Sequence, residues 1–445
     1  MDELIHELQS PKRIGLSWDA ILFLLLSAAL FWSSEAGVMI HASGENDVSL
    51  VVSLTQIFTF DPLPAVLLIV LVVYIGADFW SAGQVQFGLK VAAVWFVILL
   101  YVFFPTVVAI IYRHNTVPYL YIHDGAIQVE EAVKFLLAGK NPYTESYVPT
   151  PMAQWPFHEP GVLTNPGLFH LIYLPFLLIA SVPFYIGSLA WLGWFDQRFL
   201  YLGMLGLSAI MVPRVGANPR DKLAALMVLA LNPLFVPFFI EGRNDIVVSF
   251  WLIVVILLVQ RQRLVWAGIA LALAAATKQT SWFLIPFFAM YITGTGKASD
   301  LVHRARVLLP AALVLAAILV PFLVWSPGAF LDDVINYQSG IASGAALYPI
   351  KSLGLGSLAL GSQWIHRNTD VFPFWWFQVA FGGAGTIVML YYQWRHNTLA
   401  QMLLNYAILL FIFSFFSRTF NDNHLGFALT WLILPSFVSD VSREK

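Results

Sequence analysis

The chain has 445 residues, of which 59% are hydrophobic and only 11% are charged. Soluble domains typically carry about 25% charged residues, so this composition excludes a water-soluble fold. The formal net charge of −2 gives no basis for nucleic-acid binding, and the absence of cysteine excludes disulfides, thiolate metal ligands and thiol catalysis. We therefore expect an integral membrane protein without a nucleic-acid partner.

Apolar runs bounded by charged residues, Gly and Pro predict a single all-α membrane domain, residues 1–445, with about 12–14 spanning helices. A membrane β-barrel is not expected, because the alternating pattern of its strands is absent. Residues 16–32 favour an uncleaved first helix over a signal peptide, because the run is long and lacks a small-x-small cleavage site. Short runs within 166–213 and 264–293 are expected to be tilted, broken or re-entrant. The predicted spans are 16–33, 62–79, 89–112, 166–181, 183–195, 198–213, 222–239, 246–260, 264–277, 280–293, 307–325, 371–393, 399–416 and 424–439.

The distribution of basic residues predicts that both termini lie in the cytoplasm. Loops that stay inside a cell membrane are enriched in Lys and Arg. With the N-terminus inside, the inner loops hold 14 of the 23 basic residues, whereas the outer loops are longer and acidic. Two outer segments, 113–165 and 326–370, are too long to be simple connectors, and such loops are commonly functional. The inner basic residues are Lys12, Arg13, Lys90, Arg214, Arg220, Lys222, Arg261, Arg263, Lys297, Arg304, Arg306, Arg395, Arg443 and Lys445.

The first outer segment contains the pattern of a short amphipathic helix. Residues 126–138 mix apolar and charged side chains at helical spacing, which predicts a helix that lies on the membrane surface and ends at Gly139. Asp124 stands at the expected N-cap, where the helix end favours negative charge. A carboxylate held there could act as the general base for a hydroxyl group. The alternative is that Asp124 only caps the helix.

Three further polar clusters are predicted on the same face. Arg243, in the turn 241–245, offers a planar guanidinium to a phosphate, unless the turn is merely solvated. Lys278 interrupts an apolar stretch, so it either contacts an anion or extends to the interface. Arg418 could pair with a phosphate, and His424 could relay a proton or simply cap a helix. Together the clusters predict an outer-leaflet cavity for an amphiphile with its phosphate at the interface and its tail in lipid.

Several stretches between residues 113 and 440 occur in a recognisable order and spacing. They are His123-Asp124, residues 131–143, Asn232-Pro233, residues 242–245, residues 267–274 leading to Thr277-Lys278, and Pro286. This ordered set resembles the GT-C superfamily of multi-spanning glycosyltransferases that use polyprenyl-phosphate-linked sugars, and within it the bacterial polyprenyl-phosphate-mannose mannosyltransferase branch. Two features differ from that family: two additional helices precede the first large outer loop, and His123-Asp124 replaces its frequent acidic pair.

The resemblance implies the roles of the candidate site residues. Asp124 would activate the acceptor hydroxyl, which attacks the anomeric carbon with inversion while the lipid phosphate leaves. Cations would stabilise the charge that grows on that phosphate. We expect no bound metal and no cofactor. The expected catalytic residues are Asp124 and His424, the donor phosphate ligands are Arg243, Lys278 and Arg418, and the substrate-binding residues are His123, Asn141, Tyr143, Asn244 and Asp245.

The sequence therefore predicts a membrane glycosyltransferase. It would move a hexose, such as mannose, from a polyprenyl-phosphate donor to a lipid or glycan acceptor at the outer face of the cell membrane. A transporter or flippase of lipid-linked sugars is an alternative, which would require charged residues across the membrane midplane and repeated halves. A non-enzymatic scaffold is another, but it would leave the polar clusters of the outer face unexplained.

Overall fold

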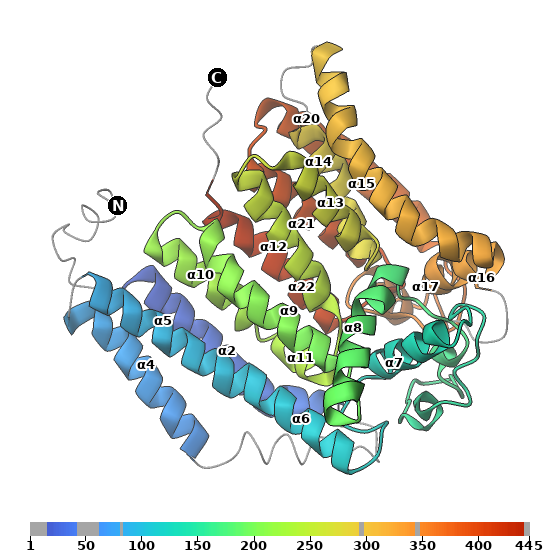
Figure 1. Ribbon diagram of the computed structural model, residues 1–445, viewed down its shortest axis with the longest axis horizontal. Coiled ribbons are helices and arrows are strands. Elements are labelled where there is room, and N and C mark those ends of the chain that lie inside the picture. Colours follow the sequence, from blue (N-terminus) through green and yellow to red (C-terminus); the bar gives the residue numbers. More distant parts are fainter. Residues whose placement is uncertain (1–15, 42–61, 81–82, 293–297, 343–347, 440–445) are drawn as a thin grey trace.

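The chain forms a bundle of helices (Figure 1). The computed structural model describes residues 16–41, 62–80, 83–292, 298–342 and 348–439. Within these residues, five helical stretches are long and apolar enough to cross a membrane, namely Gln84–Asn115, Pro175–Leu192, Arg198–Val215, Arg304–Trp325 and Phe374–Arg395. Together with the shorter apolar helices, they confirm the all-α polytopic membrane fold predicted from composition.

The first half of the chain supplies one side of the bundle. Its helices are α2 (Trp18–His41), α4 (Pro62–Trp80), α5 (Gln84–Ile98), α6 (Phe104–Asn115), α7 (Asp124–Leu137), α8 (Pro175–Leu192), α9 (Arg198–Met211), α10 (Pro219–Ala230), α11 (Val236–Glu241) and α12 (Asp245–Gln260). The π-helical turn Leu99–Phe103 joins α5 and α6 into one long helix. Short 3₁₀ turns cover Pro151–Gln154, Pro166–Leu168 and Val212–Val215.

The second half continues with α13 (Leu264–Ala275), α14 (Ile285–Tyr291), α15 (Ala298–Trp325), α16 (Pro327–Leu331), α17 (Tyr337–Ser339), α18 (Leu355–Gly361), α19 (Phe374–Phe377), α20 (Ala384–Arg395), α21 (Leu399–Phe415) and α22 (Asp422–Ile433). Two π turns, Asp332–Asn336 and Gln378–Gly383, and two 3₁₀ turns, Gln279–Leu284 and Leu434–Phe437, extend these helices. The strands β1 (Lys351–Ser352) and β2 (Thr419–Phe420) pair in parallel, with Lys351 beside Thr419.

The structure corrects three of the predicted spans. The runs 166–181 and 183–195 are not separate spans: α8 covers Pro175–Leu192 and contains Pro183 within it. Membrane helices tolerate an internal proline when neighbouring groups satisfy the freed carbonyl. The run 222–239 is divided into α10 and α11 at Pro233, which cannot donate a backbone hydrogen bond. The predicted break within 264–293 is confirmed, because the 3₁₀ turn Gln279–Leu284 separates α13 from α14.

Helix α8 does not carry the chain to the other end of the bundle. Just after it, Asp196 accepts a hydrogen bond from Arg113, near the end of α6, at 2.8 Å. Arg198, the first residue of α9, donates to the Tyr121 carbonyl at 2.6 Å. Helix α9 therefore begins at the end of the bundle where α6 stops. The predicted spans 166–181 and 183–195 are therefore both lost. Because this removes an even number of membrane crossings, the side of the membrane predicted for every later loop is unchanged.

Helix α7 exists as predicted, but its surroundings differ from the prediction. Asp124 is its first residue, and His123 is the N-cap. Every residue from Gly125 to Val133 is buried, so α7 lies within the protein and not on a membrane surface. Its polar side chains face protein groups: Glu130 forms a two-pronged ion pair with the buried Arg113, with both N–O distances 2.7 Å. The amphipathic pattern therefore reflects buried ion pairing.

A buried ion cluster ties α2, α4 and α5 together at the opposite end of the bundle. The Lys90 ammonium contacts Asp78 and lies 2.6 Å from Asp19. A buried lysine is costly unless it is paired, so these carboxylates are required for α5 to carry it. Lys90 was predicted at the inner face, with thirteen other basic residues. Of that set, Lys12, Arg13, Lys297, Arg443 and Lys445 lie outside the described residues.

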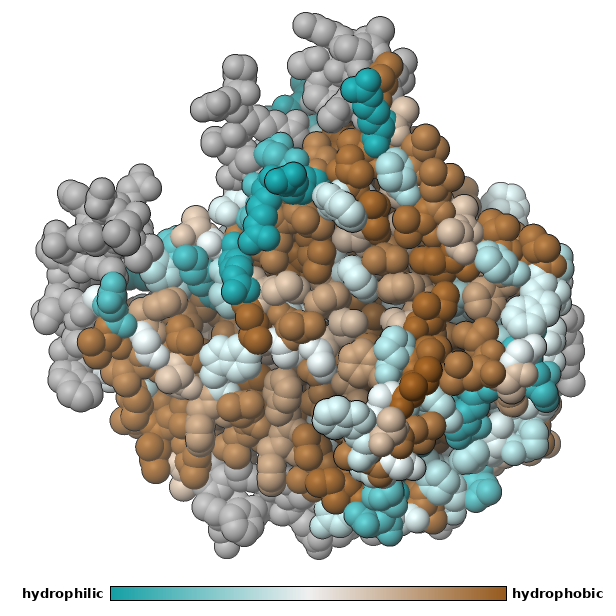
Figure 2. All heavy atoms as spheres, in the orientation of Figure 1, coloured by the Kyte–Doolittle hydropathy of each residue, from teal (hydrophilic) through white to brown (hydrophobic). Residues whose placement is uncertain are grey.

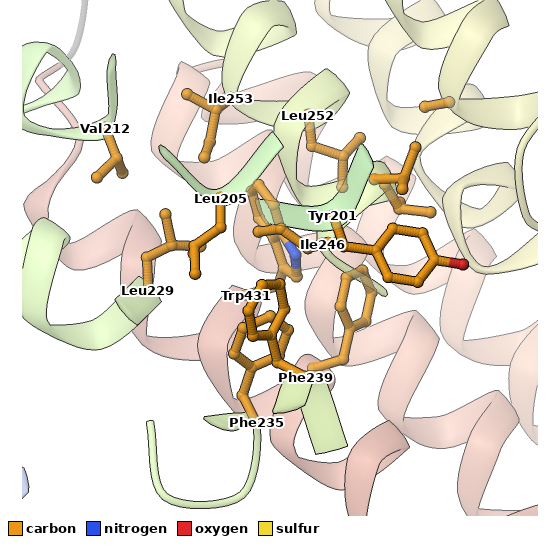
Figure 3. Packing of buried hydrophobic residues seen from close by; sticks show 14 of the residues in the cluster. Tyr201, Leu205, Val212, Leu229, Phe235, Phe239, Ile246, Leu252, Ile253 and Trp431 are labelled. Atoms are coloured by element: carbon orange, nitrogen blue, oxygen red, sulfur yellow. The ribbon is translucent and has the colours of Figure 1, made fainter. Parts of the chain in front are cut away.

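Large side chains fill the centre of the bundle. Tyr201 and Leu205 of α9, Phe239 of α11, Ile246 of α12 and Trp431 of α22 meet there and are all fully buried (Figure 3). Lipid tails are as apolar as these residues, so close van der Waals packing holds such helices together. Apolar residues also cover the flanks of the bundle, whereas hydrophilic residues lie near the loops around α7 and again at the opposite end, above α10 and α12 (Figure 2). An apolar belt between two polar ends is typical of a membrane-embedded body.

Candidate active site

The four polar clusters line a single cavity at the α7 end of the bundle. Its volume is about 1100 Å³. The walls come from segments far apart in the sequence, because the loops after α6, α11, α13, α15 and α21 all reach this end. The structure thus brings together Asp124, Arg243, Lys278, Arg418 and His424, which the sequence places as much as 300 residues apart.

Asp124 is held in the cavity wall by two donors. Its Oδ1 accepts the Gly125 backbone N–H at 2.7 Å, and its Oδ2 accepts the Asn165 side-chain N–H at 2.7 Å. His123 Nδ1 lies 3.0 Å from Oδ1. The carboxylate side chain is 17% exposed, so it is accessible from the cavity while its orientation is set by the protein. A fixed, accessible carboxylate at the start of a helix can accept a proton from a bound hydroxyl.

A buried network fixes the turn that leads into Asp124. Tyr121 has a positive φ of 61°, and Arg198 donates to its carbonyl oxygen at 2.6 Å and to that of Ile240 at 3.1 Å. Asp196 in turn receives two hydrogen bonds from the Arg198 guanidinium. Burial disfavours charge on Asp196, yet Arg198 and Arg113 outweigh it and lower the pKa of this carboxyl. Asp196 therefore stays ionised and keeps the turn in place.

The cations of the second and third clusters belong to one network. Lys278 Nζ lies 2.5 Å from Asp245 Oδ1 and 3.2 Å from Asn244 Oδ1. Asn423 connects Arg243 to the pair formed by Asp245 and Lys278, because it donates to Asp245 at 3.0 Å and accepts from Arg243 at 2.9 Å. Asp245 is 2% exposed, whereas the Lys278 side chain is 16% exposed and lines the cavity. Both residues line the cavity, but the lysine side chain is the more exposed of the two, and Asp245 holds its ammonium group in place.

Arg243 keeps donors available in the cavity. Within the part of the chain that the structure describes, the only hydrogen bond of its guanidinium is the one from Nη1 to Asn423. Its Nε lies 3.5 Å from a Glu241 oxygen, an ion-pair distance that leaves the guanidinium only loosely neutralised. The guanidinium also stacks over the Phe238 ring, 4.8 Å from the centroid. The guanidinium is therefore held in one orientation and still has N–H groups that can donate to a ligand, as a phosphate-binding arginine requires.

His424 lines the cavity, and its side chain also caps the start of helix α22. In the first turn of α22, its Nδ1 accepts the Asn421 backbone N–H at 3.3 Å. This contact assigns the proton of a neutral imidazole to Nε2, because Nδ1 is the acceptor. In that tautomer His424 can donate a hydrogen bond to an anion, but it cannot accept a proton at Nδ1 without losing the cap.

Arg418 is surrounded by backbone carbonyl oxygens. It donates to the carbonyl oxygens of Tyr348, of Asp370 at 2.8 Å and of Asn368 at 3.2 Å, and it is 2% exposed. Burial lowers the pKa of Arg418 to about 10, although the nearby Asp370 opposes this shift. These contacts anchor the segment between α15 and α19, so direct phosphate contact by Arg418 stays a prediction.

Asn141 and Tyr143 are not among the residues that line the cavity, so their role in substrate binding stays a prediction. Asn141 Oδ1 accepts the Tyr143 backbone N–H at 3.1 Å, and this closes the turn after α7. The Tyr143 hydroxyl donates to the Tyr173 carbonyl at 2.7 Å, and its ring packs edge-on against Phe330. Both residues are buried. The two residues pack behind the side chains that line the cavity.

Sequence reasoning missed three residues of the cavity region. Asn165 was not singled out, although Asn165-Pro166-Gly167 is a turn sequence in which an Asn side chain often makes such contacts. His170 lines the cavity, with Nδ1 2.8 Å from Asp333 Oδ1. Asp333 also accepts the Leu171 N–H at 2.9 Å. Burial raises the pKa of Asp333, although its bonds to His170 and Leu171 oppose the shift. No local signal connects residues 163 positions apart.

Comparison with known families identifies the class of protein. The model of glycosyltransferase family 87 matches residues 164–417, which is more than half of the chain. The chain belongs to glycosyltransferase family 87. No curated protein and no solved structure matches it. A membrane glycosyltransferase is therefore established at the level of the family.

The matched region of this family 87 glycosyltransferase contains most of the cavity. Asn165, Arg243 and Lys278 fall inside it, whereas Asp124 lies before it and His424 after it. The family match thus supports sugar transfer by the chain but assigns no role to these residues. Their roles follow from the geometry of the cavity.

Proposed function

We propose that the protein transfers a hexose, such as mannose, from a polyprenyl-phosphate donor to a lipid or glycan acceptor. The observation that carries this proposal is the arrangement of one accessible carboxylate, Asp124, in the same cavity as Arg243 and Lys278. A sugar phosphate needs cations for its leaving group, and an acceptor hydroxyl needs a base. The family membership supplies the reaction class.

The chemical step requires a single displacement. The acceptor oxygen attacks the anomeric carbon, and the bond between that carbon and the phosphate oxygen breaks with inversion. The hydroxyl proton passes to Asp124, and the polyprenyl phosphate leaves with the bonding electron pair. One carboxylate suffices, because no covalent sugar intermediate is formed. The two anchored oxygens of Asp124 keep it orientated toward the acceptor as it takes the proton.

Arg243 and Lys278 would stabilise the phosphate as it gains charge. Asp245 and Asn423 hold the two cations in place before the donor arrives, so little reorganisation is required during the reaction. His424 would add a neutral Nε2–H donor beside them. In this assignment His123 and Asn244 complete the polar wall around the substrates.

One flank of the cavity suits the lipid part of the donor. It is formed by Trp282 and Phe283 after α13, Phe413 of α21, and Phe374 and Trp375 of α19. Trp375 is 53% exposed on the side of the bundle, so this apolar wall is continuous with the lipid-facing surface. A phosphate at the polar wall and a polyprenyl chain along this flank match the two halves of the cavity. Since the basic loops predict a cytoplasmic opposite end, we place the cavity at the outer face.

The proposal is tested with purified protein in detergent. The protein is incubated with radiolabelled polyprenyl-phosphate hexoses and a total membrane lipid extract, and labelled products are separated. We expect a new labelled glycoconjugate with the wild-type protein. The Asp124→Asn variant should express normally but form product at least about 1000-fold more slowly, because the base is lost.

A matched control separates loss of the base from loss of a helix-end charge. Asp221 lies in the first turn of α10, at the other end of the bundle, and Asp221→Asn should retain full transfer. Full activity of Asp124→Asn would overturn the assignment of the base. Movement of intact donor across a liposome membrane, without any new glycosidic bond, would instead favour a flippase.

A further inference from the structure

A single amide side chain controls the orientation of Asp124. We propose that Asn165 is a positioning residue that presents Asp124 to the acceptor in one orientation. This inference rests on the proposed function for its catalytic meaning, but its physical content, a donor held against one carboxylate oxygen, can be measured without a substrate.

The two ends of the Asn165 amide have different partners. Its Oδ1 accepts the Gly167 backbone N–H at 2.9 Å, and its Nδ2 donates to Asp124 Oδ2 at 2.7 Å. The first contact decides which end of the amide faces Asp124, because only the carbonyl end can accept from Gly167. The amide cannot flip without losing both contacts. Asn165 therefore offers a donor, and never an acceptor, to the carboxylate.

The backbone around Asn165 makes this arrangement rigid. Asn165 is 7% exposed and caps the 3₁₀ turn Pro166–Leu168. The carbonyl of Gly167 accepts a hydrogen bond from Gln128 of α7 at 2.5 Å, and Gln128 also donates to the His170 carbonyl at 2.8 Å. The turn is thus fastened to the helix that Asp124 begins. Asp124 and its positioning residue move as one unit.

The electrostatic consequence is specific. A hydrogen bond donated to a carboxylate favours its ionised form, whereas a second carboxylate at the same place would disfavour it. His123, at 3.0 Å, and the tyrosines Tyr173, Tyr337 and Tyr348 interact electrostatically with Asp124. Arg243 also acts on Tyr173 and Tyr348. The tyrosines stay protonated below pH 9, since burial raises the pKa of each, that of Tyr348 to about 12.

The substitution Asn165→Asp tests this role while preserving the turn. An aspartate can still accept the Gly167 N–H, so the local fold is retained, but its second oxygen now opposes Asp124 Oδ2. We expect kcat to fall about 100-fold with KM changed less than threefold, because orientation and ionisation of the base are affected and substrate contacts are not. The acid limb of the pH–rate profile should move up by at least one pH unit.

The chain contains a closely matched control. Asn218 is also followed by proline, accepts a backbone N–H, from Asp221 at 2.9 Å, and donates Nδ2 to a carboxylate oxygen of Asp221 at 2.8 Å. It lies at the start of α10, away from the cavity. Asn218→Asp introduces the same charge and the same local repulsion, and it should leave kcat, KM and the pH profile unchanged.

A measurement without substrate keeps the inference separate from the proposed function. Water-soluble carbodiimide reacts with protonated carboxyl groups, and labelling of the Asp124 peptide can be followed by mass spectrometry as a function of pH. We expect the midpoint of Asp124 labelling to rise by at least one pH unit in Asn165→Asp and to stay unchanged in Asn218→Asp. An unchanged midpoint overturns the inference, even if the wild-type protein transfers sugar. If no sugar is transferred but the midpoint shifts, the positioning contact stands and the proposed function fails.

Discussion

Nδ1 of His170 lies 2.8 Å from Oδ1 of Asp333, although 163 positions separate the two residues. Asp333 also accepts the Leu171 N–H, and Gln279 donates to the Val334 carbonyl at 3.1 Å. The loop after α15 is thereby fastened to the segment that precedes α8. This contact closes one wall of the cavity, and it makes that wall sensitive to pH.

The first prediction concerns the stability contributed by Asp333. Burial raises the pKa of this carboxyl in the folded protein, so the folded state binds a proton more readily than the unfolded chain does. The associated stability is complete below about pH 4, the ordinary aspartate range, and it is lost as the pH rises through the folded pKa. Asp333→Asn cannot titrate. Relative to this variant, the wild-type apparent melting temperature should therefore fall as the pH increases from about 4 to 7.

Thermal unfolding in detergent at a fixed scan rate measures this difference. The neighbouring Asp332→Asn is the comparison, because Asp332 is less buried and accepts a hydrogen bond from Asn336 in its own turn. The Asp332 charge is the smallest of the causes that act on the pKa of Asp333, so the difference of this variant from wild type should vary less over the same pH range. A difference for Asp333→Asn that varies no more than that of Asp332→Asn would contradict the prediction.

The second prediction separates the two roles considered for Arg418. Arg418→Ala removes the Arg418 hydrogen bonds to the carbonyl oxygens of Tyr348 and Asp370, and it leaves that of Asn368 with only the Ile350 N–H as donor. We expect a loss of about 3 kcal/mol of stability. Arg418→Lys should recover little, because an ammonium cannot reach three carbonyls as the planar guanidinium does. Limited proteolysis should detect new cleavage in residues 348–370. Donor KM should change little at temperatures where the variant stays folded.

An exposed arginine serves as the control for Arg418. Arg395 is the last residue of α20 and stacks on Tyr391. Arg395→Ala should preserve the wild-type cleavage pattern. A large increase in donor KM for Arg418→Ala, with stability and proteolysis unchanged, would support the direct phosphate role.

The third prediction concerns the pair Lys278 and Asp245. Lys278→Met leaves the buried Asp245 carboxylate without its cation, which should cost about 3–5 kcal/mol. Asp245→Asn alone should cost less, because the Lys278 side chain can turn toward the cavity. The double variant should recover most of the stability lost in Lys278→Met. It should still fail to transfer sugar, because the cation is absent.

A double-mutant cycle of apparent unfolding free energies measures this coupling. The donor KM of Asp245→Asn, which retains the cation, is compared with that of the double variant. Additive effects of the two substitutions on stability would show that the pair is not coupled, contrary to the short contact between Lys278 Nζ and Asp245 Oδ1.

The fourth prediction uses the close approach of Tyr173 to Gly125. A Cβ atom built at Gly125 would lie 1.9 Å from the Tyr173 hydroxyl oxygen and 3.1 Å from the next ring carbon. Gly125→Ala should therefore displace the first turn of α7 and reduce transfer by at least about 100-fold, because a shift of about 1 Å misplaces Asp124. Adding Tyr173→Phe removes the clashing oxygen and should restore much of the activity.

Gly187 provides the matched control for Gly125. It lies inside α8, and a Cβ atom there would meet nothing within 4 Å, so Gly187→Ala should keep full activity and slightly increase stability. Transfer rates of the single and double variants are compared at equal amounts of folded protein. If Tyr173→Phe fails to improve Gly125→Ala, steric displacement is not the cause of the loss.

Several features could be predicted from local sequence because their causes are local. Apolar runs long enough to cross lipid predicted the helical membrane fold, and the interruption at Lys278 predicted the broken helix there. Asp124 at a helix start was also recognisable, since a capping pattern involves only adjacent residues. The error of one residue at that cap, His123 in place of Asp124, is the usual uncertainty of a helix boundary.

The surroundings of other residues could not be predicted, because they depend on distant partners. The charged face of α7 was assigned to a membrane surface, but Arg113 and Asp196 turn it into a buried ionic core. Arg418 was assigned to a phosphate, but carbonyl oxygens of the loop before α19 surround it. In both cases the residue type indicated correctly that an opposite charge or an acceptor was needed. It could not indicate which group would supply it.

The sequence by itself determined that this protein is a helical membrane protein with polar clusters on several of its loops, because hydrophobicity and helix-end chemistry act over a few residues. Only the tertiary structure decided that these clusters share one cavity, that Asp245 supports Lys278, and that Asn165 orientates Asp124. Hydrogen bonds and ion pairs act over about 3 Å in space, whatever the separation along the chain. The choice of partners is therefore made by the packing of helices, which no local pattern encodes.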